Sequence, residues 1–195
     1  MKIPLFAFAV LAMLLSGCFV QTGLAPLEAI IDKGSDRDFK FEGTWRPESN
    51  PKLPHDIDTN SITIERADDR QTYTATLRAP DNADANLSMQ FKTAEISSEN
   101  PHAIAEIELR SNEGIAYRRL AIAAALDDKL FLWMIDGRLV GEHLYNDGTA
   151  AVIEHFAFSS TIRCKSDQLL ATIRKHSRAV VGSVQIFVHV PEDGK

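Results

Sequence analysis

Segments in which apolar and polar residues alternate one by one recur along most of this 195-residue chain. Successive side chains of a β-strand point to opposite faces of a sheet, so a period of two predicts strands with one face in a core. The pattern begins at Asp38, and the chain is therefore expected to be mainly β. The apolar positions of its first five segments are Phe39, Phe41 and Trp45; Ile62 and Ile64; Tyr73, Ala75 and Leu77; Leu87, Met89 and Phe91; and Ile104 (or Ala103), Ile107 and Leu109.

Aspartate-rich turns separate several of these segments. Asp68-Asp69-Arg70 predicts a hairpin turn, and Asp127-Asp128-Lys129 follows a long apolar segment over residues 116–126. Aspartate is favoured in turns because its carboxylate accepts hydrogen bonds from nearby backbone N–H groups, so these pairs indicate turns rather than acid–base chemistry. Short loops and the lack of strand–helix–strand alternation favour an antiparallel sheet.

The strand expected over residues 130–135 is apolar on both faces. Phe131, Trp133 and Ile135 share one face, and Leu132 and Met134 share the other. A strand of this kind is central and covered on both sides, and we expect a late helix to cover it.

The last third of the chain mixes both types of element. Residues 138–145 predict one or two helical turns, and residues 156–163 predict a strand. Residues 166–176 predict a helix that starts with the capping residue Ser166 and carries Leu169, Leu170 and Ile173 on one face. Residues 184–190 alternate again and predict a closing strand.

Seven or eight strands in series with one C-terminal helix predict a small antiparallel up-and-down barrel or a strongly curled sheet. Closure of the barrel removes exposed strand edges. The residues Phe41-Glu42-Gly43-Thr44-Trp45 resemble the Gly-x-Trp element in the first strand of lipocalin-like proteins. The resemblance implies that Trp45 closes one end of the barrel; the simpler interpretation is a strand aromatic residue in the core.

The N-terminus has the parts of a secretory signal. Lys2 is followed by an apolar run from residue 3 to residue 15, broken by Pro4, and by Leu15-Ser16-Gly17-Cys18. This box resembles the bacterial lipoprotein signal, which implies cleavage between Gly17 and Cys18 and lipid attached to Cys18. The alternatives are an uncleaved membrane helix, for which about 20 residues are needed, or an ordinary signal with a coincidental cysteine.

This resemblance implies three segments: a leader over residues 1–17, a lipidated tether over residues 18–37 with a short helix at 27–33, and one β-rich domain over residues 38–195. Phe19, rather than an aspartate, follows Cys18. By the sorting pattern of enteric lipoproteins, this implies the outer membrane, with the protein facing the periplasm; the inner membrane and the cell surface are the alternatives. The net charge of −6 and the lack of a long basic run argue against nucleic acid as a partner.

The sequence holds few candidates for chemistry. Among the six histidines, the neighbours Glu142-His143 and Glu154-His155 are the pairs that would have to meet to hold a metal. Gly182-Ser183 lacks the rest of a nucleophile elbow. We therefore expect no enzyme activity, no metal and no cofactor.

Two further features have alternative interpretations. Cys164 has no cysteine partner once Cys18 carries lipid, so it is either a small buried apolar residue or a reactive thiol. Arg118-Arg119 lies within a strand, so one arginine faces the interior, where a protein carboxylate or an acidic ligand must pair with it.

The anchor, the strand series and the lack of catalytic groups together predict a non-catalytic binding module of the cell envelope, specific for a small apolar ligand or an envelope protein. The alternative is a structural or assembly factor, or an immunity-type inhibitor lipoprotein in the periplasm. The volume of the barrel interior distinguishes them, because a cavity favours a small ligand and a filled core favours a protein partner. The oligomeric state stays open.

Overall fold

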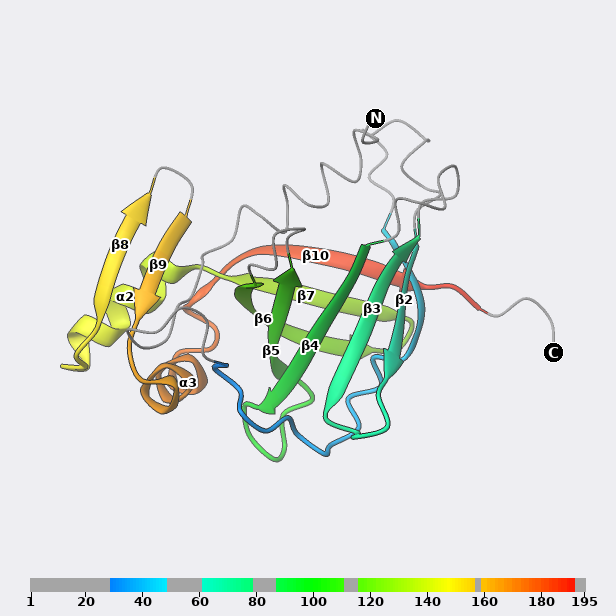
Figure 1. Ribbon diagram of the computed structural model, residues 1–195, viewed down its shortest axis with the longest axis horizontal. Helices are drawn as coiled ribbons and strands as arrows, with labels where there is room; N and C mark the ends of the chain where they lie inside the picture. The colour runs from blue at the N-terminus through cyan, green and yellow to red at the C-terminus, as the bar shows by residue number, and fades with distance from the viewer. Residues whose placement is uncertain (1–28, 49–60, 79–86, 111–115, 157–158, 192–195) are drawn as a thin grey trace.

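A computed structural model describes residues 29–48, 61–78, 87–110, 116–156 and 159–191 (Figure 1). The predicted leader, Gly17, Cys18 and the first part of the predicted tether lie outside the described residues. Within the described parts of the chain, no helix is both long and apolar enough to span a bilayer.

Eight antiparallel strands form a closed barrel in which the first seven strands pair with one another in chain order. The last strand pairs with both the seventh strand and the first and so closes the ring. The predicted up-and-down barrel is confirmed, in its closed form. Its strands are β1 (Gly43–Pro47), β2 (Ser61–Arg66), β3 (Thr72–Arg78), β4 (Leu87–Glu95), β5 (Ala103–Arg110), β6 (Ala116–Leu126), β7 (Lys129–Ile135) and β10 (Val181–His189).

The two aspartate turns lie where the sequence predicts them. In the β2–β3 turn, Asp69 Oδ1 accepts hydrogen bonds from the backbone N–H groups of Gln71 and Thr72 at 2.9 and 2.8 Å. In the β6–β7 turn, Asp127 adopts a φ of 54°. The first strand begins later than expected, at Gly43, because Lys40 has a φ of 55° and interrupts the extended backbone between Phe39 and Phe41.

The β7–β10 connection forms a separate layer outside the barrel, at the left of Figure 1. It contains α2 (Gly137–Asn146), the two-stranded sheet of β8 (Val152–Phe156) and β9 (Ser159–Arg163), and α3 (Ser166–Lys175). The single strand predicted over residues 156–163 is therefore wrong: this region contributes to a hairpin that starts at Val152.

The helix caps also differ from the sequence prediction. Ser166 is already helical, and the N-cap is Lys165, which makes no side-chain capping bond. In α2, by contrast, Asp136 caps the helix by accepting hydrogen bonds from the backbone of Arg138 and Leu139.

The chain builds two hydrophobic cores that share the wall of β6 and β7. Ala121, Ala123 and Leu130 face the barrel interior, whereas Leu120 and Ile122 face the outer layer, where α2, α3 and the hairpin cover them. The prediction that the strand over residues 130–135 is covered on both faces is confirmed, because Met134 and Ile135 are buried in different cores.

Residues 29–37 pack on the outside of the barrel wall. Ile30 and Ile31 are each 2% exposed, and their backbone N–H groups donate to the Glu106 carboxylate at 2.9 and 2.7 Å. Figure 1 shows this segment in blue, starting beside α3 and crossing toward β1. The folded unit thus begins before the predicted boundary at residue 38, and the described part of the expected short helix, residues 29–33, is not helical.

Candidate functional site

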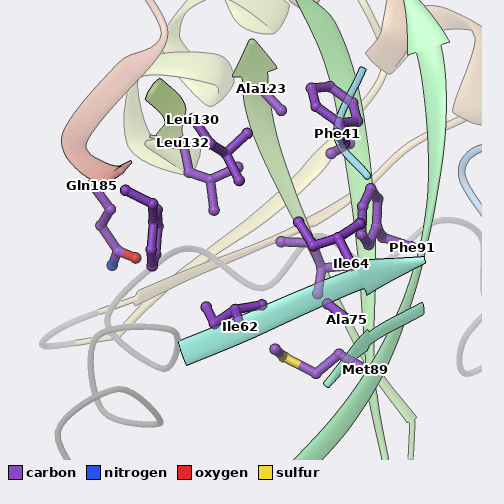
Figure 2. A pocket seen from close by; sticks show the side chains of 13 residues that line it. Phe41, Ile62, Ile64, Ala75, Met89, Phe91, Ala123, Leu130, Leu132 and Gln185 are labelled. Carbon is purple, nitrogen blue, oxygen red and sulfur yellow. The ribbon is translucent and has the colours of Figure 1, made fainter. Parts of the chain in front are cut away.

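The barrel encloses an apolar cavity of about 60 Å³. In Figure 2, Phe41 and Phe91 lie on one side of this space, and Leu130, Leu132 and Gln185 lie on the other. Gln185 is the one polar residue among the described residues of the lining. The lining consists of Phe41, Ile62, Ile64, Ala75, Met89, Phe91, Ala105, Ile107, Ala123, Leu130, Leu132, Gln185 and Phe187.

The cavity follows from the mixture of large and small residues at inward positions. Ala75, Ala105 and Ala123 come from three different strands and all face the interior, where larger apolar side chains oppose them. A small barrel of eight strands has an interior just wide enough for side chains to fill, so three alanines in the wall leave space. The alternation in the sequence identified these residues as apolar strand positions but did not show that they surround a cavity.

An aromatic cluster borders the cavity. The Tyr73 and Phe91 rings stack with centroids 5.0 Å apart, and Phe41 meets Tyr73 edge-on at 5.7 Å. Phe39 stacks on Phe41 at 5.6 Å, which extends the cluster beyond the residues that line the cavity. These contacts fix the positions of the rings, so this side of the cavity is preformed.

Trp45 lies in the barrel core beside this cluster. It is 3% exposed, and its indole Nε1 donates a hydrogen bond of 2.8 Å to the Phe41 carbonyl. His189 meets the Trp45 ring edge-on at 5.0 Å. Gly43 has a φ of 129°, and a Cβ at this position would lie 2.8 Å from His189 Nε2. The Gly-x-Trp spacing thus serves close packing of β1 against β10, and the simpler interpretation of Trp45 as a core aromatic residue is confirmed.

Gln185 provides a polar group at the edge of the cavity. Its neighbour Val184 is 46% exposed, as the alternation along β10 requires if Gln185 faces inward. Figure 2 shows the Gln185 amide across the cavity from Phe41. No hydrogen bond joins this amide to any described residue, so it can bind the polar end of a ligand that enters the cavity.

The prediction that one arginine of the Arg118-Arg119 pair faces the interior is confirmed. Arg119 is fully buried and pairs in register with Ile107, whose side chain lies in the barrel core. Arg118 faces outward, where it forms ion pairs with Glu106 at 3.4 Å and Glu108 at 3.0 Å.

Glu106 on the outer wall of the barrel binds the N-terminal segment. Burial raises the pKa of Glu106 above its usual range, although the two N–H groups of Ile30 and Ile31 and the charge of Arg118 act in the opposite direction. Because the carboxylate already accepts two backbone N–H groups and contacts a guanidinium, this site holds a part of the chain itself.

The candidate histidines and Cys164 form no metal site or reactive thiol among the described residues. His143 stacks on His176 with ring centroids 3.9 Å apart, and the side chain of His155 lies outside the described residues. In the part of the chain that the structure describes, no three His, Cys, Asp or Glu side chains are grouped to hold a metal. Cys164 is 7% exposed, and burial raises the pKa of its thiol to about 11, so its interpretation as a buried apolar residue is confirmed.

Comparison of this chain with protein-family models, with curated proteins and with solved structures finds no match.

Proposed function

We propose that this protein is a lipid-anchored, non-catalytic binding module of the bacterial cell envelope whose barrel holds a linear alkyl chain. The observation that supports the ligand is the apolar cavity with Gln185 as a polar group at its edge. Sites for small ligands commonly combine an apolar lining with a few polar groups that orient the ligand.

The small volume of the cavity favours a narrow ligand. An apolar cavity of about 150 Å³ admits benzene, whereas the volume here is about 60 Å³. A straight alkyl chain is narrower than an aromatic ring and gains about 0.8 kcal/mol for each methylene group that it buries. Met89 is unbranched and flexible, so it can shift to lengthen the cavity when a chain enters.

The anchor belongs to the same proposal and is supported by the sequence. Lipid on Cys18 holds the protein to the outer membrane, on the periplasmic side. Residues 30 and 31 are fastened to the barrel wall, so the connection from Cys18 to Ala29 extends at most about 40 Å. The barrel then stays within this distance of the lipid surface, which is a source of alkyl chains.

A fluorescent polyene fatty acid is the probe that tests whether the barrel cavity binds an alkyl chain. The full chain is assembled in lipid nanodiscs, with empty nanodiscs as a blank, and the probe is titrated into the wild type and two variants. Ala123→Phe fills the cavity and should weaken binding by about tenfold or more. Leu126→Phe introduces the same aromatic side chain outside the cavity, at a residue that is 37% exposed, and should bind the probe as the wild type does.

Equal binding by all three proteins, or no saturable binding to the wild type, would contradict the proposal. Circular dichroism shows whether Ala123→Phe is folded. An independent measurement is mass spectrometry of small molecules and proteins that co-purify with the anchored wild type from its own membranes. A stoichiometric protein partner without an alkyl ligand would instead favour the assembly or inhibitor function.

The anchor is tested separately through Cys18→Ser. Cells grown with labelled palmitate should incorporate the label into the wild type, and the variant should remain unlabelled in the uncleaved, larger form. Label on the variant, or a wild type that keeps residues 1–17, would contradict the lipid anchor without affecting the result for the cavity.

A further inference from the structure

A second hollow lies outside the barrel and has no lining residue in common with the cavity. It measures about 290 Å³ and lies between the outer face of β6 and β7 and the β4–β5 and α3–β10 connections. Its size is close to the lower end of the range for small-ligand sites, about 300 to 1,000 Å³. We call it the outer groove; it is lined by Ile96, Asn100, His102, Ile122, Trp133, Ser177, Arg178 and Val181.

The groove contains an aromatic platform. Trp133 is half-buried, so part of its ring faces the groove. Phe131 stacks against it with centroids 5.3 Å apart and 11° between the ring planes, and His102 lies at 5.3 Å on a tilt of 45°. Because neighbouring rings hold Trp133 in place, a ligand that stacks on it does not have to order a mobile side chain.

Asn100 orients the imidazole of His102. The Asn100 Oδ1 atom accepts the backbone N–H of His102 at 2.9 Å, which identifies this atom as the amide oxygen. The same oxygen contacts His102 Nδ1, so Nδ1 carries the hydrogen and donates it. Burial, and then the charge of Arg178, lower the pKa of His102 and so favour the neutral ring, in which Nε2 is an acceptor when Nδ1 carries the hydrogen.

Arg178 supplies a cation at the edge of the groove. It is exposed and forms no ion pair or hydrogen bond with the described residues. Arginine can bind a carboxylate through two parallel hydrogen bonds. Ser177 beside it adds a hydroxyl group.

The β4–β5 connection that forms one wall is held from two sides. Arg174 on α3 donates to the Glu95 carbonyl at 2.9 Å. Arg37 on the N-terminal segment donates to the carbonyls of Ser97 and Ser98 at 3.2 and 3.0 Å. The groove is therefore preformed, which lowers the entropic cost of binding a ligand.

We propose that the outer groove binds a cyclic organic acid, with the ring of the ligand on Trp133 and its carboxylate on Arg178. The Asn100 amide N–H groups and His102 Nε2 offer donors and an acceptor to hydroxyl groups on the ring. This site is independent of the barrel cavity and of the function proposed for it.

Tryptophan fluorescence tests the site directly. The chain has two tryptophans, so Trp45→Phe leaves Trp133 as the one reporter. The full-length variant in lipid nanodiscs is titrated with glucuronate, galacturonate and benzoate as cyclic acids, and with glucose and acetate as the ring alone and the charge alone. A saturable change of Trp133 emission is expected with at least one cyclic acid and with neither control compound.

Arg178→Gln should weaken this binding by about tenfold or more, whereas Arg138→Gln should leave it unchanged. Arg138 is a matched control because it is an exposed arginine that pairs with Glu142 on α2. If Trp45→Phe fails to fold, calorimetric titration of the wild type and of Arg178→Gln with the same compounds measures this binding instead. No binding of any cyclic acid up to about 10 mM, equal binding of glucose or acetate, or full binding by Arg178→Gln would overturn the proposal.

Discussion

The Glu106 side chain joins two parts of the chain that are 75 residues apart in sequence. Its two carboxylate oxygens accept one backbone N–H each, from Ile30 and from Ile31. Both donors are buried, and a buried N–H without a partner costs about 1 to 3 kcal/mol. This side chain thus fastens the start of the segment over residues 29–37 to the barrel wall.

Glu106→Ala should destabilise the protein by about 2 kcal/mol or more, because it leaves two buried N–H groups without their acceptor. Urea unfolding of the full chain measures the change in the free energy of unfolding. Glu142→Ala removes an exposed ion pair within α2 and should change this free energy by less than about 0.5 kcal/mol. Equal effects of the two substitutions would show that Glu106 does not hold the N-terminal segment.

Asp69 makes the stability of the protein depend on pH. Hydrogen bonds from Gln71 and Thr72 hold the pKa of its carboxyl below the ordinary value of 3.8. A carboxyl with a lower pKa in the folded state binds protons less readily than in the unfolded chain. Its contribution is therefore complete above pH 3.8 and is lost as the pH falls from there through the lower, folded-state pKa.

Asp69→Asn should flatten the acid side of the stability profile below pH 3.8, because asparagine does not titrate. Asp68→Asn is the matched control, because it changes the neighbouring exposed residue of the same turn while the hydrogen bonds from Gln71 and Thr72 go to Asp69. Thermal unfolding at a series of acidic pH values measures both. A slope that is the same in all three proteins would assign the acid sensitivity to other carboxyl groups.

At the scale of elements, the apolar period of the sequence predicts most strands well. It predicts less well the segments whose position depends on contacts with distant residues. The β2–β3 hairpin, β6 and α3 are visible as periods of two or 3.6 residues, since their own side chains alternate between core and solvent. The pattern over residues 156–163 predicts one strand, because no aspartate pair marks the end of β8 in the sequence. The pattern over residues 29–37 predicts a tether, because their order comes from Glu106 and the barrel wall.

Gly34 lies close to the backbone of the barrel at Gln71. A Cβ at this position would lie 2.2 Å from the Gln71 carbonyl oxygen, which is a backbone atom and cannot rotate away. Gly34→Ala should therefore displace the segment and cost about 1 to 3 kcal/mol. Limited proteolysis should then cleave within residues 29–37 more rapidly than in the wild type.

Gly182→Ala is the matched control for Gly34→Ala. A Cβ at Gly182 meets its nearest atoms at 3.6 Å, an ordinary contact distance. This substitution should change the free energy of unfolding by less than about 0.5 kcal/mol and should leave cleavage within residues 29–37 unchanged. Similar behaviour of the two variants would mean that the close approach at Gly34 does not position the segment.

At the scale of the whole molecule, one wall serves two cores and separates two hollows. The inner faces of β6 and β7 contribute Ala123, Leu130 and Leu132 to the cavity. Their outer faces contribute Ile122 and Trp133 to the outer groove. The alanine-rich sequence of β6 fits this arrangement, because small residues leave room on both sides of a strand that is covered twice.

The sequence by itself determined the mainly β fold, the up-and-down order of the strands and the inward position of one arginine, because each depends on the alternation of neighbouring residues. The tertiary structure alone decided the pairing of β1 with β10, the place of residues 29–37 and the shapes of the cavity and the outer groove. These features arise where packing brings together residues far apart in the chain, such as Ile30 and Glu106 or His102 and Arg178. The alternation of neighbouring residues carries no information about such distant contacts.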